Sequence, residues 1–395
     1  MNTRISHVKP SKLMGLLCGS MTLLCGNAMA VNGAQLGGYG IKNAMMGGAS
    51  IALPLDAMAA ANNPAGMAFV PNSFTTNVQV FQGDSSSDYV LPGNHLTNST
   101  RAFIPEGGIN WALNPQITLG LTVTGSGVGA DYERAALPVP GASNAKSKLE
   151  NMEIIPNASW KPSPDLAVGV GLNFVRQTFN AEGVIVPTPG GLFELPNHGT
   201  QSATGVGLRL GVLWNATPEF SVGATYKTRT RMGKLDGYSN DLLAYSDGKL
   251  DVPEQYGVGV AWKPAPHITL AADWLKIMWG DLKAMQDPNG FNWKNQAIVR
   301  MGVSWDVNPT WTVRAGFSKN QGQIQSAYTV QNLLAPSIHK HAFTAGASMK
   351  LDARSEISAG FELNPSTTLN GTGASTGTSL TSKVSIFMLG YQRSF

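Results

Sequence analysis

The strongest constraint on the fold is a tryptophan-marked turn that recurs along the chain. In each copy a Trp precedes a short segment ending in Pro, and a run that alternates apolar with small or polar residues follows. The copies begin at Trp111, Trp160, Trp214, Trp262 and Trp305, and a last one at Met349 lacks both the Trp and the Pro. Alternation of this kind is typical of β-strands. Because the copies are 43 to 54 residues apart, the repeated unit is a pair of long hairpins.

The apolar residues before and after each turn share one face, and the Trp marks its edge. This pattern predicts an all-β fold, a transmembrane antiparallel β-barrel with lipid outside and an aromatic girdle at the interface. Charged residues make up only 13% of the chain and the mean hydropathy is −0.05. A soluble β-sandwich or solenoid is the alternative, but a soluble protein normally carries more charge. Since no run of 18 apolar residues follows the N-terminus, a helical membrane protein is excluded.

The barrel is expected over residues 72–395, with about 14 strands. The turns on one side are a few residues long, and the connections on the other side are longer. Short turns face the periplasm in bacterial barrels, so the long connections are assigned to the cell exterior. We expect them at 83–100, 127–150, 181–200, 233–252, 278–293, 320–339 and 364–380.

Residues 1–30 have the features of a cleavable export signal. A basic start is followed by an apolar core and by the small-residue site Ala28-Met29-Ala30. Both cysteines, Cys18 and Cys25, fall inside this segment. The remainder has 28 − 3 = 25 basic residues against 24 acidic ones, which suggests no nucleic-acid partner. The expected location is the bacterial outer membrane.

Residues 31–71 differ from the barrel because glycine and alanine dominate and neither strand nor helix periodicity holds. Such a segment has few large side chains with which to build a core of its own. Two interpretations stay open, a flexible linker and a plug folded into the barrel. The expected inner wall is rich in glycine, including Gly211, Gly302 and Gly316, which leaves room for a plug.

The run Gly47–Ala52, then Asp56-Ala57 and Asn63-Pro64-Ala65, resembles the N-terminal hatch of the FadL/TodX-type outer-membrane transporters. The resemblance implies a fourteen-stranded barrel closed by a hatch. It also implies passive transport of hydrophobic compounds, either long-chain fatty acids or aromatic hydrocarbons. The hatch motif then comprises Asp56, Asn63, Pro64 and Ala65.

The family's route leaves sideways at a kink in the third strand. In this chain that strand carries Gly125, Gly127 and Gly129, where glycines would interrupt strand pairing. The alternative is that these glycines begin an external loop.

Three arginines are candidates for holding a ligand headgroup. Strand phase turns Arg209, Arg300 and Arg314 inward, because an arginine on the lipid side costs roughly 2–4 kcal/mol near the midplane. Counting from the turns places Arg300 and Arg314 at similar depth. Their guanidinium groups suit a ligand carboxylate, or they pair with inward acids such as Glu153, Asp273 and Glu362 or anchor the hatch.

Other functions have weaker signals. His339-x-His341 lacks an evident third metal ligand, so we expect a solvated strand end there, and no cofactor or metal is expected. Ser143 and Lys146 have nucleophile-pair spacing without the partner motifs, so the chain is not expected to be an enzyme. A general porin and a surface receptor or adhesin remain alternatives. The expected partners are outer-membrane lipid, lipopolysaccharide and a hydrophobic small molecule, with the barrel as a monomer.

Overall fold

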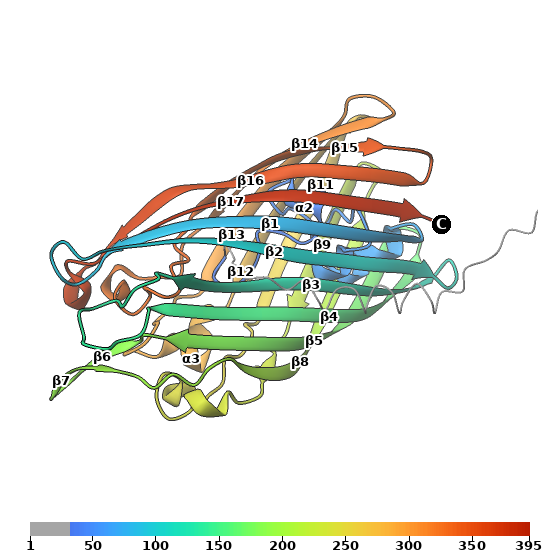
Figure 1. The fold of residues 1–395 in the computed structure, drawn as a ribbon. Helices are drawn as coiled ribbons and strands as arrows, with labels where there is room; N and C mark the ends of the chain where they lie inside the picture. The colour runs from blue at the N-terminus through green and yellow to red at the C-terminus, as the bar shows by residue number, and fades with distance from the viewer. Residues whose placement is uncertain (1–31) are drawn as a thin grey trace, which may run out of the picture.

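The computed structural model describes residues 32–395, so the predicted signal at 1–30 lies outside the described residues. Fifteen strands form one antiparallel sheet that β8 and β9 close into a barrel (Figure 1). One of them, β10, is a two-residue extension after β9. The other fourteen strands form the barrel wall. The predicted fold class is confirmed.

The strands are β1 (Ser73–Asp88), β2 (His95–Ala112), β3 (Ile117–Asp131), β4 (Lys146–Ser163), β5 (Leu166–Glu182), β6 (Ile185–Thr188), β7 (Gly191–Glu194), β8 (Gln201–Asn215), β9 (Phe220–Lys227), β10 (Arg231–Met232), β11 (Gln255–Ala265), β12 (Ile268–Ile277), β13 (Gln296–Asp306), β14 (Trp311–Asn320), β15 (His341–Lys350), β16 (Ser355–Asn370) and β17 (Ser379–Ser394). The α-helices are α2 (Ile41–Ala44) and α3 (Lys283–Gln286), and the 3₁₀ turns are η1 (Ala59–Ala61), η2 (Pro64–Phe69), η3 (Asp236–Tyr238), η4 (Ala244–Ser246), η5 (Trp279–Asp281), η6 (Ser326–Tyr328) and η7 (Gly373–Ser375). Within residues 32–395, every helix is too short or too polar to cross a membrane.

Several strands extend further toward the long-loop end than the apolar pattern predicted. The β1–β2 connection, expected at 83–100, spans only residues 89–94 between the two strands. In the extension both faces are polar, for example where Asp84 pairs with Lys383 of β17. Hydrophobic alternation disappears there although the backbone ladder continues, so the sequence pattern missed these residues.

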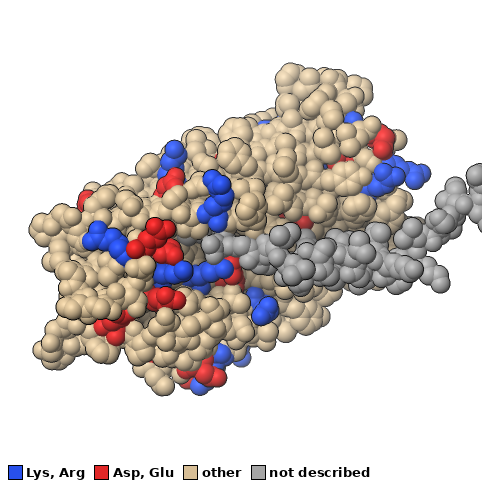
Figure 2. All heavy atoms as spheres, in the orientation of Figure 1, with Lys and Arg blue, Asp and Glu red and all other residues tan. Residues whose placement is uncertain are grey.

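The outer face carries the apolar set, with exposed side chains such as Leu210, Val258, Phe361 and Leu389. Figure 2 shows Lys, Arg, Asp and Glu gathered mainly toward the two ends of the visible face, with few between them. The exposed Trp111, Trp160, Trp214, Trp262 and Trp305 lie at the short-turn ends of their strands. This is the aromatic girdle and uncharged belt that a lipid-facing barrel needs.

The hatch, residues 32–71, lies inside the barrel (Figure 1). Nearly all of its residues are buried, and it contains only single turns such as α2, η1 and η2. Asparagine side chains donate hydrogen bonds to backbone carbonyls that helices or strands would otherwise satisfy. Asn43 Nδ2 donates to the carbonyls of Ala49 and Leu53, both at 2.9 Å, and Asn62 Nδ2 donates to that of Tyr39, also at 2.9 Å. The N-terminal segment is therefore folded, but it packs against the barrel wall rather than around a core of its own.

Candidate functional site: the hatch and a seam in the wall

A ring of inward glycines holds the hatch at the short-turn half of the barrel. A Cβ at Gly316 would overlap the Gly47 amide nitrogen, and one at Gly211 would overlap the Asn63 Oδ1 atom. The same applies on most neighbouring strands, at Gly108, Gly120, Gly169, Gly223, Gly257, Gly259, Gly302, Gly346 and Gly360. Only a residue without a side chain lets backbone approach backbone this closely. At this depth the hatch is therefore in direct contact with the wall around most of the circumference.

The Asn63-Pro64-Ala65 segment joins the hatch to the wall. Asn63 Nδ2 donates to the carbonyl of Ile51 at 2.8 Å and to that of Val212 on β8 at 3.0 Å. Its Oδ1 accepts from the Ala65 N–H at 3.1 Å, so Asn63 caps η2 while Pro64 fills the first position of that turn. Ser159 Oγ of β4 donates to the Pro64 carbonyl at 2.6 Å. One asparagine thus bonds the hatch to itself and to the barrel.

Asp56, the other member of the predicted motif, acts within the hatch. It is buried, and its Oδ1 accepts from the Met58 N–H at 2.9 Å. Its oxygens also lie where a side chain at Gly40 would have to go. Asp56 therefore orders the turn before η1, and its contacts with the wall are indirect.

Wall residues outside the predicted hatch motif also contact the hatch backbone. Asp273 Oδ2 accepts from the N–H groups of Ser50 at 2.7 Å and Ile51 at 3.1 Å. Thr344 Oγ1 is 2.8 Å from both the Gly47 N–H and the Met45 carbonyl. In the sequence, these two residues stand out only as isolated polar residues at inward positions. Because the path of the hatch backbone cannot be read from the sequence, they could not be paired with particular amide groups.

The three candidate arginines all point inward and are buried. Arg209 donates to the Ala61 carbonyl of the hatch and lies 3.5 Å from Glu153, which also pairs with Lys227 at 2.6 Å. Arg300 donates to the Gly48 carbonyl at 3.3 Å. The contacts of these two arginines are those of hatch anchors, and a role toward a ligand headgroup stays a prediction.

Arg314 is held by the wall, where it donates to Ser348 Oγ at 2.6 Å. The expectation that it shares its depth with Arg300 is wrong. Arg314 pairs with Ser304, which places Arg300 four residues (300 to 304) closer to the long-loop end, or roughly 13 Å along the strand. The β13–β14 ladder, set by its turn, fixes this offset. The two side chains therefore cannot act as one clamp.

Above the glycine ring, the wall opens between β2 and β3. Their ladder runs only from Ala112–Thr118 to Gly107–Val123. Beyond it, β2 stays paired with β1 as far as His95, and β3 stays paired with β4 as far as Asp131. We call this unpaired stretch, β2 residues 95–106 against β3 residues 124–131, the seam (Figure 1). It is a local interruption in a barrel that is otherwise hydrogen-bonded from strand to strand.

The predicted glycines lie on the seam. Gly125, Gly127 and Gly129 belong to β3 and pair with β4, so they do not begin an external loop, and pairing fails only on their β2 side. A Cβ at Gly125 would lie 3.2 Å from Ile104 Cγ2 across the seam. Near the outer end, Asn98 Oδ1 of β2 accepts from the Asp131 N–H at 2.9 Å. There a side chain provides a contact across the gap.

Cavities flank the seam. One of about 290 Å³ includes Thr100 from β2 and residues Val128–Asp131 from β3. A smaller one of about 20 Å³ lies against inward residues such as Phe81 and Val384. Val128 and Gly129 line both cavities. The two cavities therefore meet at β3, beside the seam.

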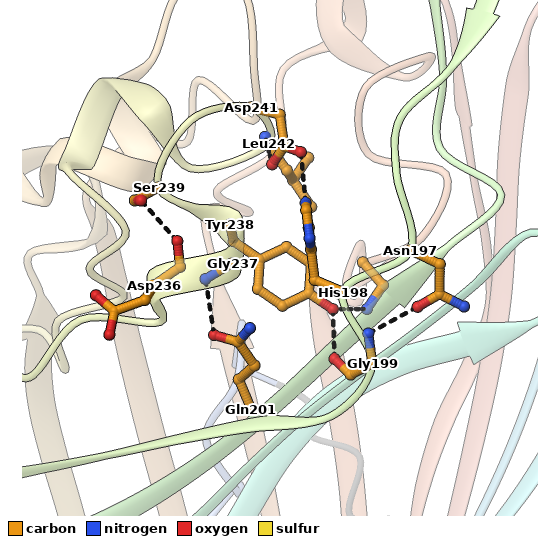
Figure 3. Close-up of polar contacts among 11 residues, drawn as sticks. Asn197, His198, Gly199, Gln201, Asp236, Gly237, Tyr238, Ser239, Asp241 and Leu242 are labelled. Carbon is orange, nitrogen blue, oxygen red and sulfur yellow. Dashed lines mark hydrogen bonds and ion pairs between the residues drawn. The ribbon is translucent and has the colours of Figure 1, made fainter.

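Above the hatch, side chains of the long loops pack against inward strand residues in a buried apolar cluster. Trp279, Met285, Trp293 and Tyr238 belong to a buried cluster with inward strand residues such as Phe179. Figure 3 shows how two loops are joined over it, with His198 Nε2 at 2.6 Å from Asp241 Oδ2. The Tyr238 hydroxyl donates to the Gly199 carbonyl at 2.8 Å (Figure 3). Burial raises the pKa of Tyr238, so its hydroxyl stays protonated at neutral pH.

The two histidines of the His339-x-His341 pair are separated by the structure. His341 is exposed on β15 and stacks on Phe317 at 5.9 Å between ring centroids. His339 is buried, so the solvated position expected for it is wrong. The loop 321–340 folds into the barrel mouth and carries His339 with it. Within residues 32–395, no group of three or more His, Cys, Asp and Glu side chains is arranged to hold a metal ion.

Comparison with known proteins gives the family. The sequence profile of the outer membrane protein transport protein family (OMPP1/FadL/TodX) matches residues 19–395. The chain belongs to this family. It is therefore an outer-membrane transport protein, as its barrel and lipid-facing belt suggest. No curated protein sequence matches the chain.

Solved structures share the fold at low sequence identity. The P. putida toluene transporter TodX has a TM-score of 0.75 at 19% identity, covering 91% of this chain and 99% of that chain. A Pseudomonas aeruginosa FadL homologue has a TM-score of 0.71 at 18% identity, covering 94% and 100%. The Ralstonia pickettii toluene transporter TbuX has 0.66 at 16%, covering 91% and 99%. These structures share the barrel fold with this chain over nearly its whole length.

Proposed function

We propose that this protein lets hydrophobic small molecules, either long-chain fatty acids or aromatic hydrocarbons, cross the outer membrane by passive diffusion. The molecule enters from outside past the apolar loop cluster and leaves sideways through the seam into the bilayer. The observation that carries the proposal is the position of the seam above the glycine ring. Because the hatch contacts the wall below it, the seam offers the shorter way out of the lumen.

The energetics favour a lateral exit. A hydrocarbon chain gains roughly 0.8 kcal/mol for each methylene that leaves water, so release into the periplasm would forfeit that gain. Release into the bilayer keeps the chain in an apolar surrounding throughout. A passive channel therefore needs no energy source along this path, and we propose no catalytic role.

Two of the relatives named above are toluene transporters and one is a FadL homologue, which supports both substrate classes. A general porin fits less well, because the ring of wall–hatch contacts at Gly211 and Gly316 leaves little space for water to pass. The working unit proposed is one barrel in outer-membrane lipid and lipopolysaccharide, since hatch, seam and lumen all come from one chain.

The test is to lock the seam. Ile104→Cys with Gly125→Cys places two thiols across it, and the native cysteines lie only in the predicted signal segment. We expect oxidation to block uptake of toluene and of a fatty acid into cells, and reduction to restore both. Ile109→Cys with Leu121→Cys is the matched control, since this pair lies in the intact part of the same ladder. Undiminished uptake through the oxidised seam pair, with the disulfide verified by mass, would exclude lateral exit.

A further inference from the structure

A groove of about 520 Å³ lies on the outer face of the barrel wall, close to the short-turn end. Five neighbouring strands line it, from β14 through β15, β16 and β17 to β1. Ala347 and Ala359 pair with each other across β15 and β16, and larger side chains such as Trp311, Ile357 and Leu389 surround them. The two small side chains leave a hollow in a surface that faces lipid.

The wall behind this groove has little side-chain material on either face. The residues preceding Ala347 and following Ala359 are Gly346 and Gly360, which also pair with each other. A Cβ on either glycine would overlap Met45 of the hatch. The hatch therefore packs against the inner face at this level, while methyl groups are the main cover on the outer face. An apolar chain in the groove would supply the packing contacts that are missing there.

Positive charge is concentrated at the short-turn end of the groove. Lys350, Arg354 and Arg393 lie at the ends of β15, β16 and β17, and all three are exposed. The one acidic side chain in the turn between β15 and β16 is Asp352. Its Oδ1 accepts from the N–H groups of Arg354 at 2.7 Å and Ser355 at 2.9 Å, so its position is set by the turn backbone.

The guanidinium group of Arg393 is close to the groove lining. Arg393 Nη1 donates to Ser355 Oγ at 2.9 Å, and the hydroxyl of Tyr391, which lines the groove, lies 3.4 Å from the same oxygen. The Ser394 N–H donates to the Arg354 carbonyl at 2.8 Å, so the two arginines lie on adjacent strand ends.

Both arginines can accept a further partner. An arginine side chain has five N–H donors, and the contact with Ser355 uses one of those on Arg393. Neither Arg354 nor Arg393 takes part in an ion pair with another residue of the described chain. An anion that approaches this end of the groove therefore finds two guanidinium groups without a carboxylate partner.

The other short turns of the barrel lack this combination. Among the described residues, the exposed or half-buried basic side chains beside them are Lys161, near the β4–β5 turn, and Lys263, near the β11–β12 turn. Each of these turns thus has one basic residue. The cluster at the β15–β17 end is the place where several cations and an apolar groove coincide.

We propose that this groove is a binding site for one anionic phospholipid of the periplasmic leaflet, with an acyl chain between the strands' side chains and the phosphate on Arg354 and Arg393. Short turns face the periplasm, and the leaflet on that side consists of phospholipid. A guanidinium group matches the geometry of a phosphate, and basic residues at a membrane surface favour anionic lipid over zwitterionic lipid. The site is separate from the seam, so it does not depend on lateral exit.

The first experiment tests the headgroup. Purified barrel is titrated with phosphatidylglycerol or phosphatidylethanolamine of the same acyl chains, and bound lipid is counted by native mass spectrometry. We expect the wild-type protein to prefer phosphatidylglycerol, and Arg354→Gln with Arg393→Gln to weaken its binding by roughly tenfold or more. Lys161→Gln with Lys263→Gln removes the same charge elsewhere and should keep the preference. A wild-type protein without the preference, or an equal loss in both double variants, would overturn the site.

The second experiment tests the groove. Ala347→Phe with Ala359→Phe fills the hollow with side chains that lipid tolerates, so we expect the barrel to fold and to bind phosphatidylglycerol several-fold more weakly. Ala224→Phe with Ala272→Phe is the control, because these alanines pair with the exposed Val212 and Val260 on another part of the outer face. Equal binding by the two variants would place the acyl chain outside the groove and contradict the proposal.

A measurement on the wild-type protein covers a variant that fails to fold. Phosphatidylglycerol with a photoreactive diazirine in its acyl chain should crosslink to groove residues such as Met349, Ile357 and Leu389. Unlabelled phosphatidylglycerol should suppress these crosslinks more strongly than phosphatidylethanolamine. Crosslinks spread evenly around the belt, or equal suppression by the two lipids, would overturn the proposal.

Discussion

The short-turn half and the long-loop half of this barrel differ in how the wall is paired and in what fills the interior. In the short-turn half, glycines such as Gly211 and Gly316 let the hatch backbone contact the wall, and β2 and β3 are paired. In the long-loop half, β2 and β3 separate, and the Asn98–Asp131 hydrogen bond reaches across the gap. The lumen there is filled mainly by loop side chains such as Trp279 and Trp293, which pack in one buried cluster with Ala34 of the hatch.

This difference suggests a division of labour. Close backbone contact is hard to deform, because packed interiors have few voids and transmit strain. A strand edge without ladder bonds separates more easily, since fewer hydrogen bonds must break. The lower half is thus suited to closing the barrel, and the upper half to letting an apolar molecule through its wall.

The largest effect is expected from a methyl group in the glycine ring. Gly316→Ala places a Cβ on the Gly47 amide, and overpacking of this kind costs roughly 1–3 kcal/mol or more. We expect the hatch to be displaced from the wall. Conductance in planar bilayers should then rise toward that of a barrel lacking residues 31–70. Gly171→Ala is the control, because its Cβ would meet the movable Ile155 side chain at 3.0 Å. Identical conductance in both variants would mean that the ring does not seal the barrel.

Replacing two arginines separates anchoring from ligand binding. Arg300→Gln with Arg314→Gln removes the charges but keeps a donor near the Gly48 carbonyl and Ser348. Because these groups hold the hatch and the wall, we expect uptake of a fatty acid and of a neutral hydrocarbon to change together. Selective loss of fatty-acid uptake would instead identify a headgroup site in the lower half and weaken the contrast between the halves.

A smaller effect is expected at the hatch motif. Asn63→Ala leaves the carbonyls of Ile51 and Val212 without this donor, a loss of about 1–3 kcal/mol if they stay buried. We expect more frequent brief openings in single-channel records, while the heat-resistant folded band on gels is retained. Asn62→Ala serves for comparison, since Asn62 bonds only the Tyr39 carbonyl within the hatch. Equal opening in both variants would show that the bond to the wall is unimportant.

The last prediction concerns stability rather than transport, and it tests the pH dependence of the seam side. The pKa of His339 is about 4 when folded, below the value of about 6.5 expected in the unfolded chain. The unfolded state binds more protons between these values, so stability falls as the pH drops from about 6.5 to 4, by at most about 3 kcal/mol. Urea unfolding of the reconstituted barrel should show this slope, and His339→Leu should reduce it. A variant with the wild-type slope would assign the pH dependence to other groups.

Alternation and turn spacing were sufficient to predict a fourteen-stranded barrel, because lipid on one side and packed residues on the other impose a period of two. The same rule placed Arg209, Arg300 and Arg314 on the inner face. It missed the polar extensions of β1 and β2, where neither face meets lipid and the apolar period vanishes. It also overlooked the staggered pairing that separates Arg300 from Arg314.

The sequence by itself determined the membrane barrel, the small-residue hatch segment and the glycines that make room for it, since each follows from local composition and periodicity. Only the tertiary structure decided which wall residue contacts which hatch amide, as with Asp273 and Ser50, or Gly211 and Asn63. It also decided that the β2–β3 ladder ends at Gly107–Val123 and that loop 321–340 brings His339 to this point. These are contacts between residues up to hundreds of positions apart, and closure of the barrel fixes them through strand register, which no local pattern encodes.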